Sequence, residues 1–357
     1  MSEFVVHLLA RDVARGAQAY AAEVCDRLDS DSWHHEVLTI FDAADGSPRF
    51  RSLGLPETAR PARGVQWRAL RPLRKYLADN NVTMIVGHGS EPLLYALLAA
   101  PRAIPVVYYR IGVSGDNLSS RLRRNLYKLL VRRCPLVMGV SQETLDDSQR
   151  VFGVDPDRLR LVPNGRDPAP FVGLSPTNRG NGPVRLLWVS RMTPHKRPEW
   201  FVSLVAQLRQ MGLPVEGVMV GDGPMLDELL VAAPIDGIQL LGRRDDVPEQ
   251  MASSDIFCFT SEGENEGMPG VLIEAGMAGL PTVSTRVAGA STVIDDGVTG
   301  LLAGCDDLDG VAEATAGLVV DAGRRRQLGD AAARRCHDLF TLDASAASLQ
   351  GALRELA

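Results

Sequence analysis

Residues 261–278 read SEGENEGMPGVLIEAGMA, an acidic, glycine-rich stretch that separates an apolar run from a segment of helical composition. The run before it, residues 255–260 (DIFCFT), is typical of a buried strand, and residues 271–278 favour a helix. This order predicts an α/β unit whose helix N-terminus faces a ligand, because the first N–H groups of a helix have no partner within it. The stretch therefore indicates a phosphate site.

Carboxylates and backbone N–H groups come together here. Glu266 lies in the loop, and Glu274 lies one or two turns into the expected helix. Carboxylates accept hydrogen bonds from hydroxyls, while the N–H groups of Gly270, Val271 and Leu272 can bind phosphate oxygens, so a nucleotide sugar suits the stretch. The alternative is that Glu266 is a solvated loop residue and Glu274 a charge on the outer face of the helix.

Length and composition limit the class of protein. A chain of 357 residues with 45% hydrophobic residues favours two globular domains. The net charge of −6 argues against a general nucleic-acid binder. Five scattered cysteines without a C-x-x-C spacing indicate neither a disulfide framework nor a zinc site, and no apolar run has the length of a signal peptide. We therefore expect a cytoplasmic protein.

Apolar runs alternate with helical segments in both halves, which predicts doubly wound α/β domains. The expected strands are residues 4–9, 36–40, 84–86, 106–109, 136–140, 184–189, 215–220, 238–241, 255–260 and 282–284. A further strand is expected to end at Pro163. A Gly/Pro/Asn-rich connector, GLSPTNRGNGP at 173–183, lies between the halves. We expect an N-terminal domain at 1–176, a C-terminal domain at 177–340, and a last helix within 341–357 that packs back on the first domain.

A basic element follows the first strand of the second half. Residues 190–198 (SRMTPHKRP) place Arg191 and Lys196 at the carboxyl end of that strand, where ligands of open α/β sheets gather. The planar guanidinium of an arginine can form paired hydrogen bonds to a diphosphate, and a lysine adds a mobile point charge. Both could therefore neutralise charge on a departing nucleotide. The alternative is a pair of solvated surface cations.

The stretch Glu266-Gly267-x-Pro269, followed by Glu274, resembles the E-x7-E motif of the retaining GT-B glycosyltransferases of family 4, the group 1 glycosyltransferases. Residues 190–198 resemble the R-x4-K element of that family. Weaker similarities cover most of the chain: RGAQ at 15–18 to the first-loop glycine motif, PNGRD at 163–167 to the end of the N-terminal domain, and VGDGP at 220–224 to a glycine turn.

The resemblance implies an α/β GT-B fold, with two facing Rossmann-like doubly wound domains and a cleft between them. It implies retaining transfer of a sugar from a UDP- or GDP-sugar donor to a hydroxyl of a glycan, glycolipid or small molecule, with no cofactor and no metal. The catalytic residues implied are Arg191, Lys196 and Glu266. The substrate-binding residues implied are Gly16, Gly221, Gly267, Met268, Pro269, Gly270, Val271, Leu272 and Glu274.

Two departures from the family pattern leave alternatives open. Family members often have a His where this chain reads Arg110-Ile111-Gly112, and Thr292 stands where a Glu is usual. His88 is a candidate for the missing His, although a His in a turn is more often structural. The competing functions are a non-catalytic partner subunit, a sugar-nucleotide epimerase, a phosphorylase and a two-lobed solute-binding protein. The Asp-x-Asp triplets, at 29–31, 155–157 and 307–309, look like helix caps.

Residues 119–133 (SSRLRRNLYKLLVRR) predict a basic amphipathic helix with leucines at helical spacing. Such a helix either packs on its domain with a solvated basic face or lies on an anionic membrane. A lipid-linked acceptor would favour peripheral contact with the inner membrane face.

Overall fold

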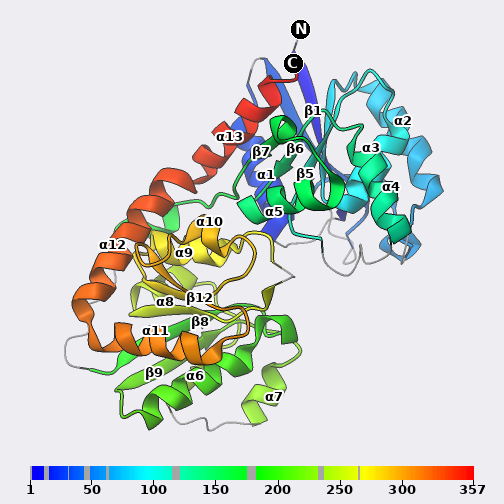
Figure 1. Cartoon of the computed structure of the whole chain (residues 1–357). Coiled ribbons are helices and arrows are strands. Elements are labelled where there is room, and N and C mark those ends of the chain that lie inside the picture. The colour runs from blue at the N-terminus through cyan, green and yellow to red at the C-terminus, as the bar shows by residue number, and fades with distance from the viewer. Residues whose placement is uncertain are drawn as a thin grey trace. The chain divides into compact units, whose positions relative to one another are not determined.

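The computed structural model describes residues 2–11, 16–30, 32–43, 49–61, 64–114, 121–174, 182–231, 237–263 and 266–357. The chain divides into two compact units, one of Met1–Gly165 with Leu342–Ala357 and one of Arg166–Thr341 (Figure 1). The second unit begins before the expected residue 177, because the N–H of Arg166 already donates to the carbonyl of Phe340, 2.9 Å away.

The first unit contains a parallel sheet that has seven strands in the described part of the chain. Its order, β3-β2-β1-β4-β5-β6-β7, reverses direction between β1 and β4, which is the topological switch point of a doubly wound sheet. The strands are β1 (Glu3–Arg11), β2 (Trp33–Phe41), β3 (Arg51–Leu55), β4 (Met84–His88), β5 (Val106–Arg110), β6 (Val137–Gly139) and β7 (Leu159–Leu161).

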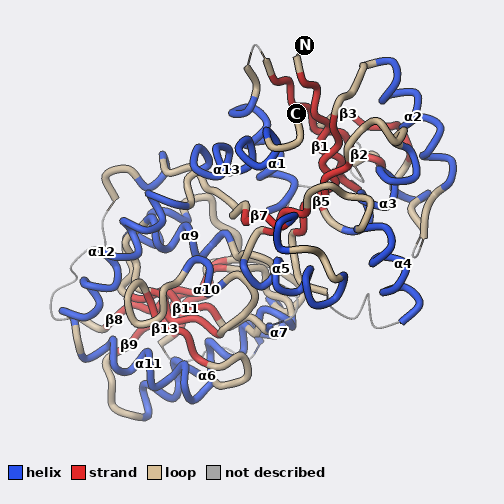
Figure 2. Tube along the Cα trace, turned by 45° about the horizontal axis from the view of Figure 1, so that its top comes forward, coloured by secondary structure: helices blue, strands red, loops and turns tan. Residues whose placement is uncertain are grey.

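Helices cover both faces of this sheet. The helices are α1 (Gly16–Leu28), α2 (Leu70–Asp79), α3 (Ser90–Ala99), α4 (Arg121–Val131), α5 (Gln142–Asp147) and α13 (Leu342–Arg354). Leucines of α2 and α3 join the apolar cluster that contains Val6 and Leu8, whereas α1 packs on the opposite face, where Leu9 contacts Ala21 and Cys25. The C-terminal helix α13 lies beside α1 (Figures 1 and 2).

The second unit repeats the plan with a six-stranded parallel sheet in its described part, ordered β10-β9-β8-β11-β12-β13. The order reverses between β8 and β11, so the carboxyl ends of these two strands flank the second switch point. The strands are β8 (Val184–Val189), β9 (Val215–Val220), β10 (Ile238–Leu240), β11 (Ile256–Phe259), β12 (Thr282–Thr285) and β13 (Gly300–Ala303).

The helices of this unit also lie on both sides of its sheet (Figure 2). They are α6 (Pro198–Gln210), α7 (Leu226–Val231), α8 (Val247–Ala252), α9 (Gly270–Met277), α10 (Ala290–Val293), α11 (Leu308–Val320) and α12 (Ala322–Leu339), with a short 3-10 helix at Pro194–Lys196. Phe201 of α6 and Val311 of α11 share a core cluster with the fully buried Trp188 of β8.

The prediction of two doubly wound α/β domains with parallel sheets is confirmed. Strands β3 and β13, both at sheet edges, were not expected from the sequence. Within the described residues, no helix is both long and apolar enough to cross a bilayer.

Candidate functional site

The predicted site residues of the second unit converge on its switch point. Arg191 follows β8 after one intervening residue, and Lys196 ends the short 3-10 helix that comes next. Glu266 lies in the segment between β11 and α9, and Glu274 lies in α9 itself. Because β8 and β11 are hydrogen-bonded neighbours, their carboxyl ends bring these two segments to one edge of the sheet.

Lys196 and Glu266 are bound to each other. The ammonium of Lys196 forms an ion pair with Oε1 of Glu266, which also accepts a 2.6 Å hydrogen bond from the Ser261 hydroxyl. The two charged side chains are only 18% and 10% exposed, and Nζ lies 5.2 Å from the ring centre of Phe259. The predicted cation and the predicted carboxylate therefore neutralise each other in a mostly buried place.

Hydroxyls after β11 fix the backbone around Lys196. The Thr260 hydroxyl contacts the carbonyl of Lys196 at 3.1 Å and accepts a 3.0 Å hydrogen bond from the Trp188 indole. The Ser261 Oγ lies 3.0 Å from the carbonyl oxygen of His195, and the N–H of Glu262 donates to that oxygen at 2.8 Å. The loops after β8 and β11 are thus joined directly, so the position of Lys196 is set by the fold.

The N-terminus of α9 provides fewer donors than expected. Pro269 is its N-cap residue, and the N–H of Leu272 donates to the Pro269 carbonyl at 3.2 Å. The Leu272 N–H thus has a partner within the helix, its side chain is core at 1% exposure, and its contact with phosphate stays a prediction. Gly270 and Val271 remain as first-turn donors. Met268 is also buried, which leaves its backbone as the part that could meet a ligand.

Two glycines are explained by close packing of loops. Gly221 has φ 140°, and a Cβ there would lie 1.8 Å from the carbonyl oxygen of Ser190. Gly289 has φ 77°, and a Cβ there would lie 2.2 Å from the carbonyl oxygen of Gly267. Both positions need glycine for its positive φ and for lack of a side chain. Gly221 therefore supports the loop that carries Arg191, and Gly289 supports the segment between Glu266 and α9.

Sequence reasoning missed Arg166. Its Nε donates to Oε1 of Glu274 at 2.8 Å, and its guanidinium lies against the Cα of Gly270. No pattern in the sequence could have found this contact, because Arg166 precedes Glu274 by 108 residues.

The residues predicted for the first unit are Gly16 and His88. Gly16 begins α1, while residues 12–15 of the first-loop motif lie outside the described part of the chain. His88 is in the core rather than at the surface, and its Nε2 is 3.0 Å from Nδ1 of His7. Nε2 of His7 is in turn 3.0 Å from Nδ1 of His35. Burial lowers the pKa of His88 to about 3, so this imidazole is neutral near pH 7.

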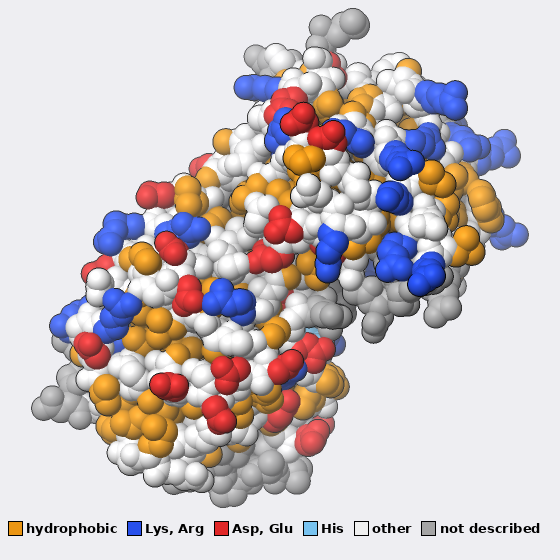
Figure 3. Space-filling view, in the orientation of Figure 1, with side chains coloured by type: hydrophobic (Ala, Val, Ile, Leu, Met, Phe, Trp, Pro, Cys, Tyr) orange, Lys and Arg blue, Asp and Glu red, His pale blue; other side chains and the backbone are white. Residues whose placement is uncertain are grey.

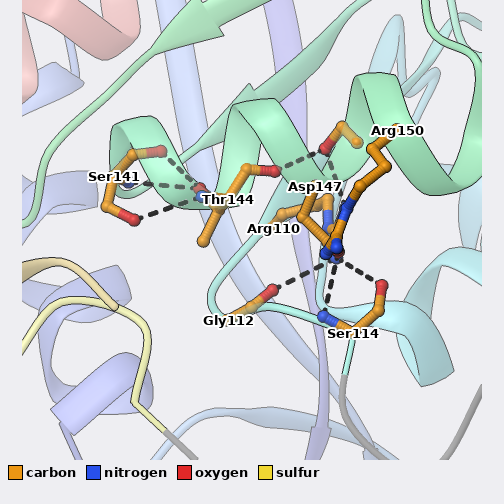
Figure 4. A network of polar contacts seen from close by, with 8 residues as sticks. Arg110, Gly112, Ser114, Ser141, Thr144, Asp147 and Arg150 are labelled. Carbon is orange, nitrogen blue, oxygen red and sulfur yellow. Dashed lines mark hydrogen bonds and ion pairs between the residues drawn. The ribbon is translucent and has the colours of Figure 1, made fainter. Parts of the chain in front are cut away.

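Arg110, which stands where the family often has a His, is locked in a buried network (Figure 4). Its Nη2 lies 2.6 Å from Oδ2 of Asp147, and both side chains are at most 3% exposed. The Ser114 N–H donates to the same oxygen at 2.9 Å. Burial raises the pKa of Asp147, but the Ser114 hydrogen bond and the charge of Arg110 outweigh it and keep that pKa below its usual range. Arg110 thus anchors the chain after β5.

Two of the three aspartate triplets cap helices, as predicted, whereas Asp29 accepts a hydrogen bond from the N–H of His35 in β2. Asp155 accepts a 3.1 Å hydrogen bond from the N–H of Asp157, and Asp307 accepts one of 2.8 Å from Gly310. Among the residues that the structure describes, no group of three His, Cys, Asp or Glu side chains is placed to hold a metal ion.

Two family models match this chain and together span most of it. The model described as "Glycosyl transferases group 1" matches residues 183–321, and the model described as "Glycosyltransferase Family 4" matches residues 14–170.

Curated relatives and solved structures agree with these matches. A GDP-mannose-dependent alpha-(1-6)-phosphatidylinositol monomannoside mannosyltransferase of Mycobacterium tuberculosis is 26% identical, over 95% of this chain and 94% of the relative. A UDP-Gal:alpha-D-GlcNAc-diphosphoundecaprenol alpha-1,3-galactosyltransferase of Escherichia coli is 25% identical, over 68% of this chain and 67% of the relative. An Anabaena protein crystallised with UDP superposes with a TM-score of 0.82 at 18% identity, over 99% of this chain and 100% of that one. The structural likeness shows the fold.

Proposed function

This chain belongs to the group 1, family 4 glycosyltransferases of the GT-B fold, and we propose that it transfers a hexose-type sugar, with retention, from a nucleotide diphosphate sugar to a hydroxyl acceptor. One observation carries the proposal: Arg191, Lys196 and Glu266 come from two segments that meet at the switch point of the second sheet. A UDP- or GDP-sugar is the donor, since relatives named for each nucleotide are similar to this chain.

In the proposed reaction, the bond between the anomeric carbon and the β-phosphate oxygen breaks, and a bond from the acceptor oxygen forms on the same face of the sugar. The acceptor proton moves to the departing phosphate oxygen, so no covalent nucleophile is required. Arg191 and Lys196 stabilise the negative charge that grows on the diphosphate. Glu266 holds Lys196 before the donor arrives and orients sugar hydroxyls afterwards.

The two cations fill the place that a divalent metal would take in stabilising the leaving group, and we propose that the transfer is metal-independent. The test is incubation with UDP-, GDP- and ADP-sugars in EDTA, with nucleotide release and thermal stability measured, because a bound ligand raises the melting temperature. NMR of the product should show the anomeric configuration of the donor. An inverted product, or activity restored only by Mg²⁺ or Mn²⁺, would contradict the proposal.

We further propose that the acceptor is lipid-linked and that α4 contacts the membrane. Leu122, Leu126 and Leu129 are 81%, 49% and 59% exposed, and their spacing places them on one face of the helix. Tyr127 and Val131 are buried on its other side and attach α4 to the unit. The helix therefore packs on its domain and still presents leucines to solvent.

The charge around these leucines suits an anionic surface. Residues 121–133 contain six Lys or Arg and no Asp or Glu. Figure 3 shows Lys and Arg together with hydrophobic side chains on the part of the surface where Figure 1 labels α4. Each basic residue near an anionic bilayer contributes about 1 kcal/mol, so the group can hold the protein at low salt.

Co-sedimentation with phosphatidylglycerol vesicles tests this contact. We expect binding at low salt that Leu122→Ser, Leu126→Ser and Leu129→Ser together weaken. The matched control replaces two exposed apolar residues of the second unit, Met211→Ser and Val320→Ser, which are 62% and 72% exposed. Wild-type protein that stays in the supernatant would instead favour a water-soluble acceptor.

A further inference from the structure

Arg166 has a fixed backbone. It is the first residue of the second unit, its N–H donates to the carbonyl of Phe340 at 2.9 Å, and it forms a parallel bridge with Thr341. These contacts hold its Cα to the segment by which the chain leaves the unit. The side chain therefore starts from a defined point, unlike that of an arginine in a surface loop.

The Arg166 guanidinium rests on the first residue of α9. A Cβ at Gly270 would lie 1.6 Å from Nη2 and 2.2 Å from Cζ of Arg166, so any side chain there would displace the guanidinium. From this position Nε donates to Oε1 of Glu274 at 2.8 Å. The two charged side chains are 21% and 27% exposed, which leaves the pair within reach of a ligand.

The same arrangement therefore occurs twice in the proposed donor site. Lys196 holds Glu266, and Arg166 holds Glu274, so each carboxylate of the motif has a cation that comes from a distant part of the chain. A carboxylate has about four acceptor sites, so one bound to Arg166 can still accept hydrogen bonds from a diol. A guanidinium at one oxygen also restricts the rotamers of Glu274, which lowers the entropy cost of binding.

We propose that Arg166 is a positioning residue for Glu274: it orients this carboxylate toward the ribose diol of a nucleoside diphosphate, and Gly270 is required because it makes room for the guanidinium. The inference rests on the proposed function, since it assumes that a nucleotide binds at α9.

Calorimetric titration with UDP, GDP and the 2′,3′-dideoxy form of whichever binds tests the inference. We expect Arg166→Gln, Glu274→Gln and Gly270→Ala each to weaken binding of the ribonucleotide about tenfold, the effect of losing one charged hydrogen bond. We expect the Arg166→Gln/Glu274→Gln variant to bind no worse than either single variant. The dideoxy nucleotide should bind all of these proteins with nearly the same affinity, which a merely structural role of Arg166 would not produce.

Other outcomes overturn the inference in distinguishable ways. If Arg166→Gln weakens the ribonucleotide and its dideoxy form equally, Arg166 acts on the phosphates and not through Glu274. If Arg166→Gln and Gly270→Ala leave both affinities unchanged, Arg166 has no part in donor binding, although the proposed function stands. If wild-type protein binds neither UDP nor GDP, the proposed function fails and the inference fails with it. Gly270→Ala keeps every charge, so it reports on Arg166 even if Arg166→Gln does not fold.

Discussion

The charged residues of the proposed donor site form ion pairs with each other in the absence of a ligand. A substitution of one of them therefore also changes the environment of its partner. Lys196 is bound to Glu266, so a diphosphate must compete with a carboxylate for the ammonium. An ion pair that is mostly removed from water is costly to break from one side only, because the remaining charge loses its partner.

We predict that Glu266→Gln lowers kcat about 10²-fold while the protein binds nucleoside diphosphate as tightly as the wild type or more tightly. The sugar loses an oriented acceptor, which slows the reaction, whereas Lys196 loses its competing carboxylate. Glu262→Gln is the matched control, because this neighbouring carboxylate is 41% exposed and its ion pair with Arg197 has the longer distance of 3.8 Å. Steady-state kinetics and calorimetry separate the two effects, and parallel losses of kcat and affinity would contradict the account.

The sequence predicted which residues belong to the proposed site but not which residues they contact. Residue types and spacing pointed to Arg191, Lys196, Glu266 and Glu274, because they lie in the segments that follow two recognisable strands or in the helix after one of them. The same reasoning could not find the partner of Glu274 or the burial of Arg110, since both depend on contacts between segments far apart in the sequence.

Among the elements, the buried central strands were predictable, whereas two of the edge strands, β3 and β13, were not. Residues 184–189 and 215–220 form strands with the bounds that their apolar runs predicted. By contrast, β3 (RSLGL) carries exposed and polar residues, and β13 (GLLA) is only four residues long. Edge strands pack on fewer neighbours, so their sequences carry a weaker apolar pattern.

Replacing a turn glycine by alanine and replacing a helix glycine by alanine should change the free energy of unfolding in opposite directions. We predict that Gly221→Ala lowers the free energy of unfolding by about 2 kcal/mol or more, because the backbone has a positive φ that favours glycine and a Cβ would meet the Ser190 carbonyl.

We predict that Gly317→Ala, inside α11 with open space around it, raises the free energy of unfolding by about 0.5–1 kcal/mol. Urea unfolding measures both, and equal effects would contradict the packing described here.

At the scale of the whole molecule, three histidines from three strands form a buried chain that exists only in the folded protein. Burial lowers the pKa of His35 to about 4, partly opposed by Asp29, and that of His88 to about 3. Burial and the two neighbouring imidazoles also lower the pKa of His7. Unfolded histidines titrate near pH 6.5, so below that pH the unfolded chain binds protons that the folded chain does not.

We predict that stability is full above about pH 6.5 and falls as the pH drops to 5, by at most about 1.4 kcal/mol per pH unit for each of the three histidines. This window lies above the range in which carboxylates titrate. His35→Gln should reduce the slope by about one proton. Unfolding free energies at several pH values give the slope, and a flat profile from pH 6.5 to 5 would contradict neutral burial.

We propose that the second unit binds a nucleoside diphosphate through protein cations alone. Calorimetric titration of the wild type and the Arg191→Ala/Lys196→Ala variant with UDP and GDP, in EDTA, tests it most directly. The account predicts that the wild type binds at least one of the two nucleotides without metal and that the variant binds it about 10²-fold more weakly or worse. Undiminished binding by the variant, or no binding of either nucleotide by the wild type, would contradict it.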